Sequence, residues 1–226
     1  MTIKEYFGDW TKVIDPTELS KILKWLKTID RSLLCPEPKN IFKAFQLCPY
    51  DNCKVIMLGQ DPYPQKEVAT GVLFGNSTSV PILSPSLQIL KEAVIDYTIP
   101  HNIIEFDNSL ESWAKQGILM INTALTCEVN KVGSHFHVWK GFVSKLLENI
   151  SSRDNGLIFM LFGNQASSFK DNIQGNHFIL EEYHPAYYAR KGIIMPNKIF
   201  KETNRILKNQ YNLEIEFYKE TEYGTC

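Results

Sequence analysis

Four short apolar runs, separated by helical patterns, constrain the fold of this sequence more than any other feature. The runs cover residues 55–58, 118–121, 157–162 and 178–180. Runs this short and this apolar suit strands that are buried on both faces of a sheet. Helical spacing of apolar residues occurs between and after them, at 86–97, 138–150, 164–172 and 197–208. The alternation predicts an α/β fold with a central four-stranded parallel sheet and helices on both of its faces.

The N-terminal part of the chain is predicted to be helical. Asp15 is a favourable N-cap, Pro16 suits the first turn, and Glu18 lies three residues after the cap. The apolar residues that follow share one helical face, and a shorter helix is expected at 40–47. We divide the chain into a helical part at 1–50, an α/β core at 51–210 and an acidic tail at 211–226, within a single domain.

Composition and charge exclude several classes of protein. The 24 basic and 25 acidic side chains give a formal net charge of −1, which argues against a histone-like nucleic-acid binder but allows a local basic face. No apolar run reaches the roughly 18 residues that cross a bilayer, and the first residues lack the features of a signal or transit peptide. The five cysteines show no CxxC spacing, so we expect reduced thiols, no zinc site, no disulfide and a cytoplasmic location.

Polar side chains follow the end of each predicted strand. The four strands are followed in order by Asp61, Asn122, Asn164 and His184. Ligands of open α/β sheets bind beyond the carboxyl ends of the strands, so these groups should meet in one crevice, near Tyr63 and Phe74. Aromatic rings can stack on a planar ring, an amide can read its edge, and Asp and His can handle charge. The sequence therefore predicts a pocket for a planar polar ring, and no phosphate-loop or metal-ligand spacing competes with it.

The loop motifs occur in a distinctive order along the chain. They are Gly59-Gln60-Asp61-Pro62-Tyr63, Gly71-Val72-Leu73-Phe74, Ser84-Pro85-Ser86-Leu87, Trp113-Ala114-Lys115-Gln116-Gly117, Asn122-Thr123-Ala124-Leu125-Thr126, Ser134-His135 and His184-Pro185. In this order and spacing they resemble the motifs of family 1 uracil-DNA glycosylases, from about residue 34 to residue 207. The resemblance implies a DNA repair enzyme that flips uracil out of DNA, hydrolyses its N-glycosidic bond and leaves an abasic site. It implies no metal and no cofactor.

The resemblance also implies roles for single residues. Asp61 matches the aspartate that activates or orients the attacking water, and His184 matches the histidine that hydrogen-bonds to uracil O2. The matches to uracil-binding residues are Gln60 through its backbone, Tyr63 as the barrier to a 5-methyl group, Phe74 as the stacking ring and Asn122 as the amide that reads the base edge. The chemistry agrees, because a carboxylate stabilises positive charge on the sugar and a neutral imidazole stabilises negative charge on the leaving base.

Three departures from the family pattern concern the grip on DNA. Pro64 replaces a histidine that contacts a phosphate, as in the poxvirus branch of the family, whose protein also serves the replication machinery. Tyr188 stands where a leucine is wedged into the space left by the flipped base, and Asn164 stands where serine is common. The residues we expect to contact DNA are Pro64, Ser86, Asn164, Tyr188 as the wedge, and the basic pair Arg190 and Lys191.

Other interpretations stay open at this level. Taken singly, Asp61 could shape a turn, Asn122 could cap a segment and His184 could be structural. The alternative functions are excision of another modified pyrimidine, a replication-accessory role as a DNA-binding protein, and binding of a free nucleobase. We expect a monomer that acts on single- or double-stranded DNA containing uracil and does not bind membranes. DNA-mimicking protein inhibitors of the family are further candidate partners.

Overall fold

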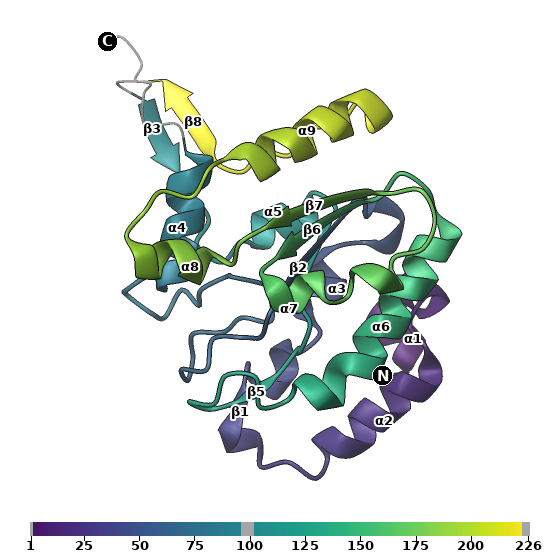
Figure 1. Ribbon diagram of the computed structural model, residues 1–226. Coiled ribbons are helices and arrows are strands. Elements are labelled where there is room, and N and C mark those ends of the chain that lie inside the picture. The colour runs from purple at the N-terminus through teal and green to yellow at the C-terminus, as the bar shows by residue number, and fades with distance from the viewer. Residues whose placement is uncertain (1, 96–101, 223–226) are drawn as a thin grey trace.

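A four-stranded parallel sheet lies at the centre of the molecule (Figure 1). Across the sheet its strands are β4 (Ile118–Asn122), β2 (Val55–Gly59), β6 (Ile158–Phe162) and β7 (Phe178–Glu182), and all neighbours run parallel. The structure, a computed structural model, describes residues 2–95 and 102–222. The predicted fold class and the positions of the four strands are confirmed.

Each central strand contributes side chains to two separate cores, because successive residues of a strand point to opposite faces. In β2, Ile56 and Leu58 join the first core, whereas Val55 and Met57 join the second. The first core is covered by α1 (Ile3–Phe7), α2 (Pro16–Leu26), α3 (Lys43–Leu47) and α6 (Phe136–Arg153), and the second by α4 (Pro85–Val94), α5 (Glu111–Lys115) and α9 (Lys198–Tyr211). Burial on both faces explains why the strands are apolar throughout.

The helix boundaries follow local signals with some differences from expectation. Helix α2 begins as predicted, because the Asp15 carboxylate accepts a hydrogen bond from Glu18 N–H at 2.8 Å. The helix expected at 164–172 is instead α7 (Asn164–Ser167) followed by a 3₁₀ turn at Lys170–Asn172. The helix expected at 40–47 is reduced to α3, which a 3₁₀ turn precedes. The predicted end of α4 at residue 97 lies outside the described residues.

Among the described residues, four short strands and the helices α5 and α8 (Pro185–Lys191) were not foreseen. Strand β1 (Leu34–Cys35) pairs with β5 (Cys127–Glu128), and β3 (Asn102–Glu105) pairs with β8 (Lys219–Glu222), both antiparallel. The second pair forms an arm that projects from the body (Figure 1). Helix α8 follows β7 directly. Strands of two to four residues carry too little periodicity to be recognised in a sequence.

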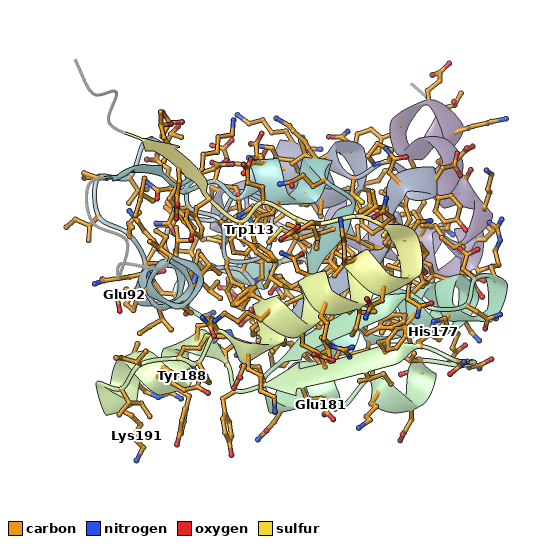
Figure 2. All side chains as sticks on the ribbon, turned by 90° about the horizontal axis from the view of Figure 1, so that it is seen from above. Glu92, Trp113, His177, Glu181, Tyr188 and Lys191 are labelled. Carbon is orange, nitrogen blue, oxygen red and sulfur yellow. The ribbon has the colours of Figure 1, made fainter. Side chains whose placement is uncertain are left out.

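The segment predicted as an acidic tail is packed on the body over part of its length. Ile215 and Phe217 are buried, and Phe217 O accepts a hydrogen bond from Trp113 Nε1 at 2.8 Å. The rings of Trp113 and Phe217 meet edge to face with centroids 4.9 Å apart. Figure 2 shows Trp113 inside the molecule, below the C-terminal segment. Residues 211–226 therefore do not form a separate tail in the described part.

We expect Phe217→Ala to lower the free energy of unfolding by about 3–5 kcal/mol, the usual cost of removing a buried phenyl ring. Urea unfolding followed by circular dichroism measures the change. The control is Ile194→Ala, because the Ile194 side chain is 83% exposed and its loss should cost less than about 0.5 kcal/mol. Equal stability of the two variants would contradict the packing of the C-terminal segment.

Candidate active site

The carboxyl ends of the parallel strands open onto one pocket of about 260 Å³. Asp61 follows β2, Asn122 ends β4 and His184 follows β7, so the sheet brings together groups that are far apart in the sequence. The predicted site residues that line this pocket are Gln60, Asp61, Tyr63, Pro64, Phe74, Ser86, Asn122, His184 and Arg190. The crevice expected from the sequence is thus present at the expected edge of the sheet.

The carboxylate of Asp61 is held by two hydrogen-bond donors. Its Oδ2 accepts from Gly133 N–H at 2.6 Å, and its Oδ1 accepts from Gln60 Nε2 at 3.1 Å. Burial raises the pKa of Asp61, while the two hydrogen bonds act in the opposite direction. The result is a carboxylate with a fixed orientation at the wall of the pocket.

Sequence reasoning missed the contribution of Gly133. The contact comes from its backbone, so no side chain signals it, and the one hint is a glycine at a φ of 73°. The neighbouring Ser134-His135 motif fixes this loop. Ser134 Oγ accepts from the N–H of Glu128 at 2.8 Å, and His135 Nδ1 shares a hydrogen bond with Thr126 Oγ1 at 3.0 Å.

His184 is a neutral hydrogen-bond donor in this fold. It is the N-cap of α8, where its Nδ1 accepts from Ala186 N–H at 3.2 Å. A neutral imidazole carries one proton, so the proton is on Nε2. Burial lowers the pKa of His184 to about 4, and the Arg190 cation acts in the same direction. At neutral pH the ring can therefore stabilise a developing anion by donating a hydrogen bond.

The side-chain oxygen of Asn122 is a buried acceptor in the pocket. This atom, Oδ1, makes no hydrogen bond within the part of the chain that the structure describes. Such atoms are costly in a folded protein, so this oxygen indicates a ligand that donates to it. Gly59 makes room for the amide, because a Cβ there would lie 3.0 Å from Asn122 Oδ1 and 2.2 Å from Leu73 Cδ1.

The aromatic walls of the pocket are tied to each other. Tyr63 donates its hydroxyl hydrogen to Phe74 O at 3.0 Å. Phe74 has a φ of 62°, a costly conformation for a residue other than glycine. Its ring meets that of His184 edge to face at 5.3 Å. Ser84, which the sequence showed only as part of a motif, donates to Asn76 Oδ1 at 2.8 Å and accepts from the N–H of Leu87 at 3.4 Å.

The residues predicted to contact DNA are divided among different positions. Pro64, Ser86 and Arg190 line the pocket. Asn164 does not line it, but it is exposed at the start of α7, directly after Gly163, where a Cβ would lie 3.0 Å from His184 Cβ. Lys191 is exposed at the end of α8 and points away from the body (Figure 2).

Tyr188 contradicts the expectation that its ring fills the space of a flipped base. The residue is 6% exposed, packs in the second core and donates its hydroxyl hydrogen to Glu182 Oε1 at 2.6 Å. The phase of the helix explains the burial. Ala186 and Arg190 are four residues apart and line the pocket, so Tyr188, midway between them, lies on the opposite side of α8, against α4.

The fold and the pocket together define a class of enzyme. A carboxylate, a neutral N–H donor, an edge-reading amide and aromatic walls suit cleavage of a bond between a sugar and a planar base. Within residues 2–95 and 102–222, no three His, Cys, Asp or Glu side chains gather in a way that could hold a metal ion. No helix in these ranges is long and apolar enough to cross a membrane.

Comparison with known proteins identifies the family. A sequence profile of the Uracil DNA glycosylase superfamily matches residues 45–208. The uracil-DNA glycosylase of Fusobacterium nucleatum is 32% identical over 219 residues, which cover 93% of this chain and 95% of the relative. That of Campylobacter jejuni is 38% identical over 198 residues, 86% of this chain and 84% of the relative. The chain belongs to the uracil-DNA glycosylase family, and it is a DNA repair hydrolase that excises uracil.

Solved structures agree with this fold. A point variant of mimivirus UNG, solved in complex with UGI, matches with a TM-score of 0.74 at 25% sequence identity, over 92% of this chain and 83% of that chain. The mimivirus uracil-DNA glycosylase by itself matches with a TM-score of 0.71 at 22% identity, over 96% and 93% of the two chains.

The pH dependence of kcat/KM should show an acid limb only. In the catalytic roles that we propose below, Asp61 acts in its ionised form and its pKa is raised, whereas His184 acts in its neutral form and its pKa is about 4. Both conditions hold at neutral pH and are lost on acidification, so the rate should be flat around neutral pH and fall as the pH is lowered. His184→Gln, which keeps an N–H donor that does not titrate, should leave a limb set by Asp61 alone. A rate that falls as the pH is raised from about 6 to about 8 would show instead that the reaction requires a charged imidazole.

Proposed function

We propose that this chain is a family 1 uracil-DNA glycosylase in which Asp61 and His184 are the catalytic groups. Cleavage of the N-glycosidic bond builds positive charge on deoxyribose and negative charge on uracil. The Asp61 carboxylate stabilises the sugar cation and orients the attacking water, while His184 Nε2–H donates to uracil O2. Because these two groups balance the charge, the reaction needs no metal and no cofactor. The tautomer of His184, set by Ala186 N–H, supports this assignment.

Uracil is selected by an amide and by a closed aromatic wall. The unpartnered Oδ1 of Asn122 accepts from uracil N3–H, and its Nδ2 donates to O4. Cytosine presents the reverse pattern, so a fixed amide rejects it. Phe74 stacks on the base and Tyr63 bars a 5-methyl group, which the hydrogen bond between Tyr63 and Phe74 O supports. The Gln60 backbone helps hold the base, and its carbonyl is fixed by Thr123 Oγ1 at 2.7 Å.

The duplex is gripped around the mouth of the pocket. The target base must leave the stack before it can react. Pro64, Ser86 and Asn164 contact the strand that carries it, and Arg190 and Lys191 bind its phosphates.

Since Tyr188 is buried, we assign the wedge to its neighbour Tyr187. Tyr187 is half-buried and stacks on Tyr183, which is 58% exposed, with ring centroids 4.7 Å apart. An aromatic ring in this position can fill the space that the flipped base leaves.

The surface that binds DNA should also bind an acidic protein that mimics DNA. The mimivirus relative solved with UGI supports this extension to the present chain. We further propose that the chain acts as a monomer on single- and double-stranded DNA. The cytoplasmic location inferred from the cysteines stays a prediction.

Asn122 carries the proposed selectivity, and base release tests it. The wild-type protein should release uracil from a single-uracil oligonucleotide in excess EDTA, detected by alkaline cleavage of the abasic site. Asn122→Asp should lose most of this rate and gain slow release of cytosine, because a carboxylate can accept from cytosine N4 and, when protonated, donate to N3.

Asp61→Asn serves as the control, since it should lose uracil release without gaining any activity on cytosine. Restoration of a lost wild-type activity by magnesium or zinc would refute metal independence. Absence of cytosine release by Asn122→Asp would contradict the role of Asn122 in reading the base.

Tyr187→Ala should slow excision from a U·A duplex by roughly tenfold to a hundredfold, because base–aromatic stacking contributes about 1–3 kcal/mol. The loss should be smaller on U·G and smallest on single strands, where less stacking must be replaced. Tyr188→Ala should instead lower the melting temperature and slow all three substrates equally. If Tyr188→Ala gives the graded pattern and Tyr187→Ala does not, α8 turns on binding DNA and the assignment to Tyr187 is wrong.

A further inference from the structure

Two cysteines face each other beside the loop that carries Asp61. Cys35 in β1 and Cys127 in β5 are direct partners in the antiparallel pair, which lies at the lower edge of the molecule in Figure 1. Side chains so placed have Cβ atoms about 4.5–5.5 Å apart, so a small movement brings them to the separation found in disulfides. The two thiols are almost fully buried, and each shifts the pKa of the other.

Both thiols also contact the backbone that follows Asp61. Cys127 Sγ donates to Pro62 O at 3.4 Å, and Cys35 Sγ lies 3.4 Å from Pro64 O and 3.7 Å from Gln65 O. A thiol has one hydrogen to donate. The segment 62–65 contains Tyr63 and Pro64 of the pocket wall. Oxidation of the cysteine pair therefore changes contacts to the backbone segment that carries Tyr63 and Pro64 of the uracil pocket.

The two cysteines differ in their surroundings. Cys35 lines a second cavity of about 200 Å³, outside the uracil pocket, together with Arg31 and Lys66. The Cys127 thiol lowers the pKa of the Cys35 thiol, and the Lys66 cation acts in the same direction. The Cys35 thiol and burial raise the pKa of the Cys127 thiol. The cavity is lined by two basic residues, Arg31 and Lys66, and two acidic ones, Glu37 and Glu67, and it includes Cys35 but not Cys127. Cys35 is thus the thiol that a small oxidant reaches first, and Cys127 is the thiol that resolves its oxidised form.

We propose that Cys35 and Cys127 form an oxidation site that reacts with hydrogen peroxide and closes to a disulfide, which switches off uracil excision. The inhibitory part rests on the role of the Asp61 loop proposed above. The Cys35 thiolate attacks one peroxide oxygen, the O–O bond breaks, and a sulfenic acid and water form. The Cys127 sulfur then attacks the Cys35 sulfur, the S–O bond breaks and a second water leaves. Two thiols lose two electrons to one peroxide, giving one disulfide and two waters.

The disulfide disturbs the loop because neither sulfur then has a hydrogen to donate. Pro62 O loses its donor from Cys127, whereas Pro64 O and Gln65 O keep the N–H groups of Asn130 and Val68. A buried carbonyl without a donor is unfavourable, so the backbone at Pro62 moves to find another. Asp61 is adjacent to Pro62, so a shift of the Pro62 backbone moves the Asp61 carboxylate relative to Gly133 N–H, which holds it in place. We expect excision to fall at least tenfold.

A second pair of cysteines provides a comparison within the same chain. Cys48 and Cys53 are also buried, and Cys53 raises the pKa of the Cys48 thiol. Their sulfurs contact Pro49 O at 3.9 Å and Val55 O at 3.5 Å, neither of which lines the uracil pocket. We therefore expect oxidation of Cys48 and Cys53 to leave Asp61 in place, because their sulfurs do not contact the segment next to it.

The experiment treats the reduced full chain with hydrogen peroxide and follows excision and cross-linking separately. We expect a loss of excision that dithiothreitol reverses, and a peptide that links Cys35 to Cys127 by mass spectrometry under non-reducing conditions. Cys35→Ser and Cys127→Ser keep a hydrogen-bond donor, so each should excise uracil when reduced. Cys35→Ser should resist peroxide, whereas Cys127→Ser should form a sulfenic acid at Cys35 but no cross-link. Cys48→Ser, the matched control, should stay sensitive.

Three results would overturn the proposal. They are no link between Cys35 and Cys127 after peroxide, a complete link with unchanged excision, and equal peroxide sensitivity of wild type and Cys35→Ser. Should Cys35→Ser fail to fold, Cys127→Ser still tests the pair, because it should form the sulfenic acid without the cross-link. Inactivity of the reduced wild type would instead count against the proposed function, because the cross-link is measured without reference to excision.

Discussion

The parallel pairing of β2 with its two neighbours is the constraint on which the site depends. In this register Gly59 lies opposite Asn122, and β6 and β7 end at the same edge. Parallel strands all point their carboxyl ends one way, so three separate loops deliver Asp61, Asn122 and His184 to a single pocket. Gly59 completes the arrangement, because any side chain there would strike Leu73 and the Asn122 amide. The apolar burial that stabilises the sheet therefore also determines how far apart Asp61, Asn122 and His184 lie in the pocket.

Burial determines the electrostatics of the site as well as its shape. Removal of His184 from water keeps its imidazole neutral, and the N–H of Ala186 decides which nitrogen carries the proton. The same burial would protonate Asp61 more easily, and Gly133 N–H and Gln60 oppose this by stabilising the charged form. Burial and hydrogen bonds thus act together on the protonation states of Asp61 and His184. The thiols under the Asp61 loop add a third set of polar contacts to the same few residues of backbone.

Helix α8 shows how the phase of one short helix divides roles among adjacent side chains. Ala186 and Arg190 line the pocket, whereas Tyr188 lies two residues from each, on the face that packs against α4. A motif alignment gives Tyr188 the place of the family's wedge, but a helix turns by about 100° per residue, so adjacent positions point in different directions. The hydrogen bond to Glu182 adds a polar anchor to this buried ring. The direction of each side chain, and not its position in a motif, decides that Tyr188 is buried and Tyr187 is partly exposed.

The sequence by itself determined the sheet, most helices and the identity of the pocket residues, because apolar periodicity and loop motifs are local properties of the chain. The α2 cap at Asp15 and the strand at β2 are examples in which local signals sufficed. Only the tertiary structure decided the burial of Tyr188, the packing of Phe217 on Trp113, the Gly133 contact to Asp61 and the pairing of Cys35 with Cys127. Each of these joins residues distant in sequence or depends on which way a backbone turns. Such contacts produce no periodic pattern in the sequence, because they depend on how distant segments pack together.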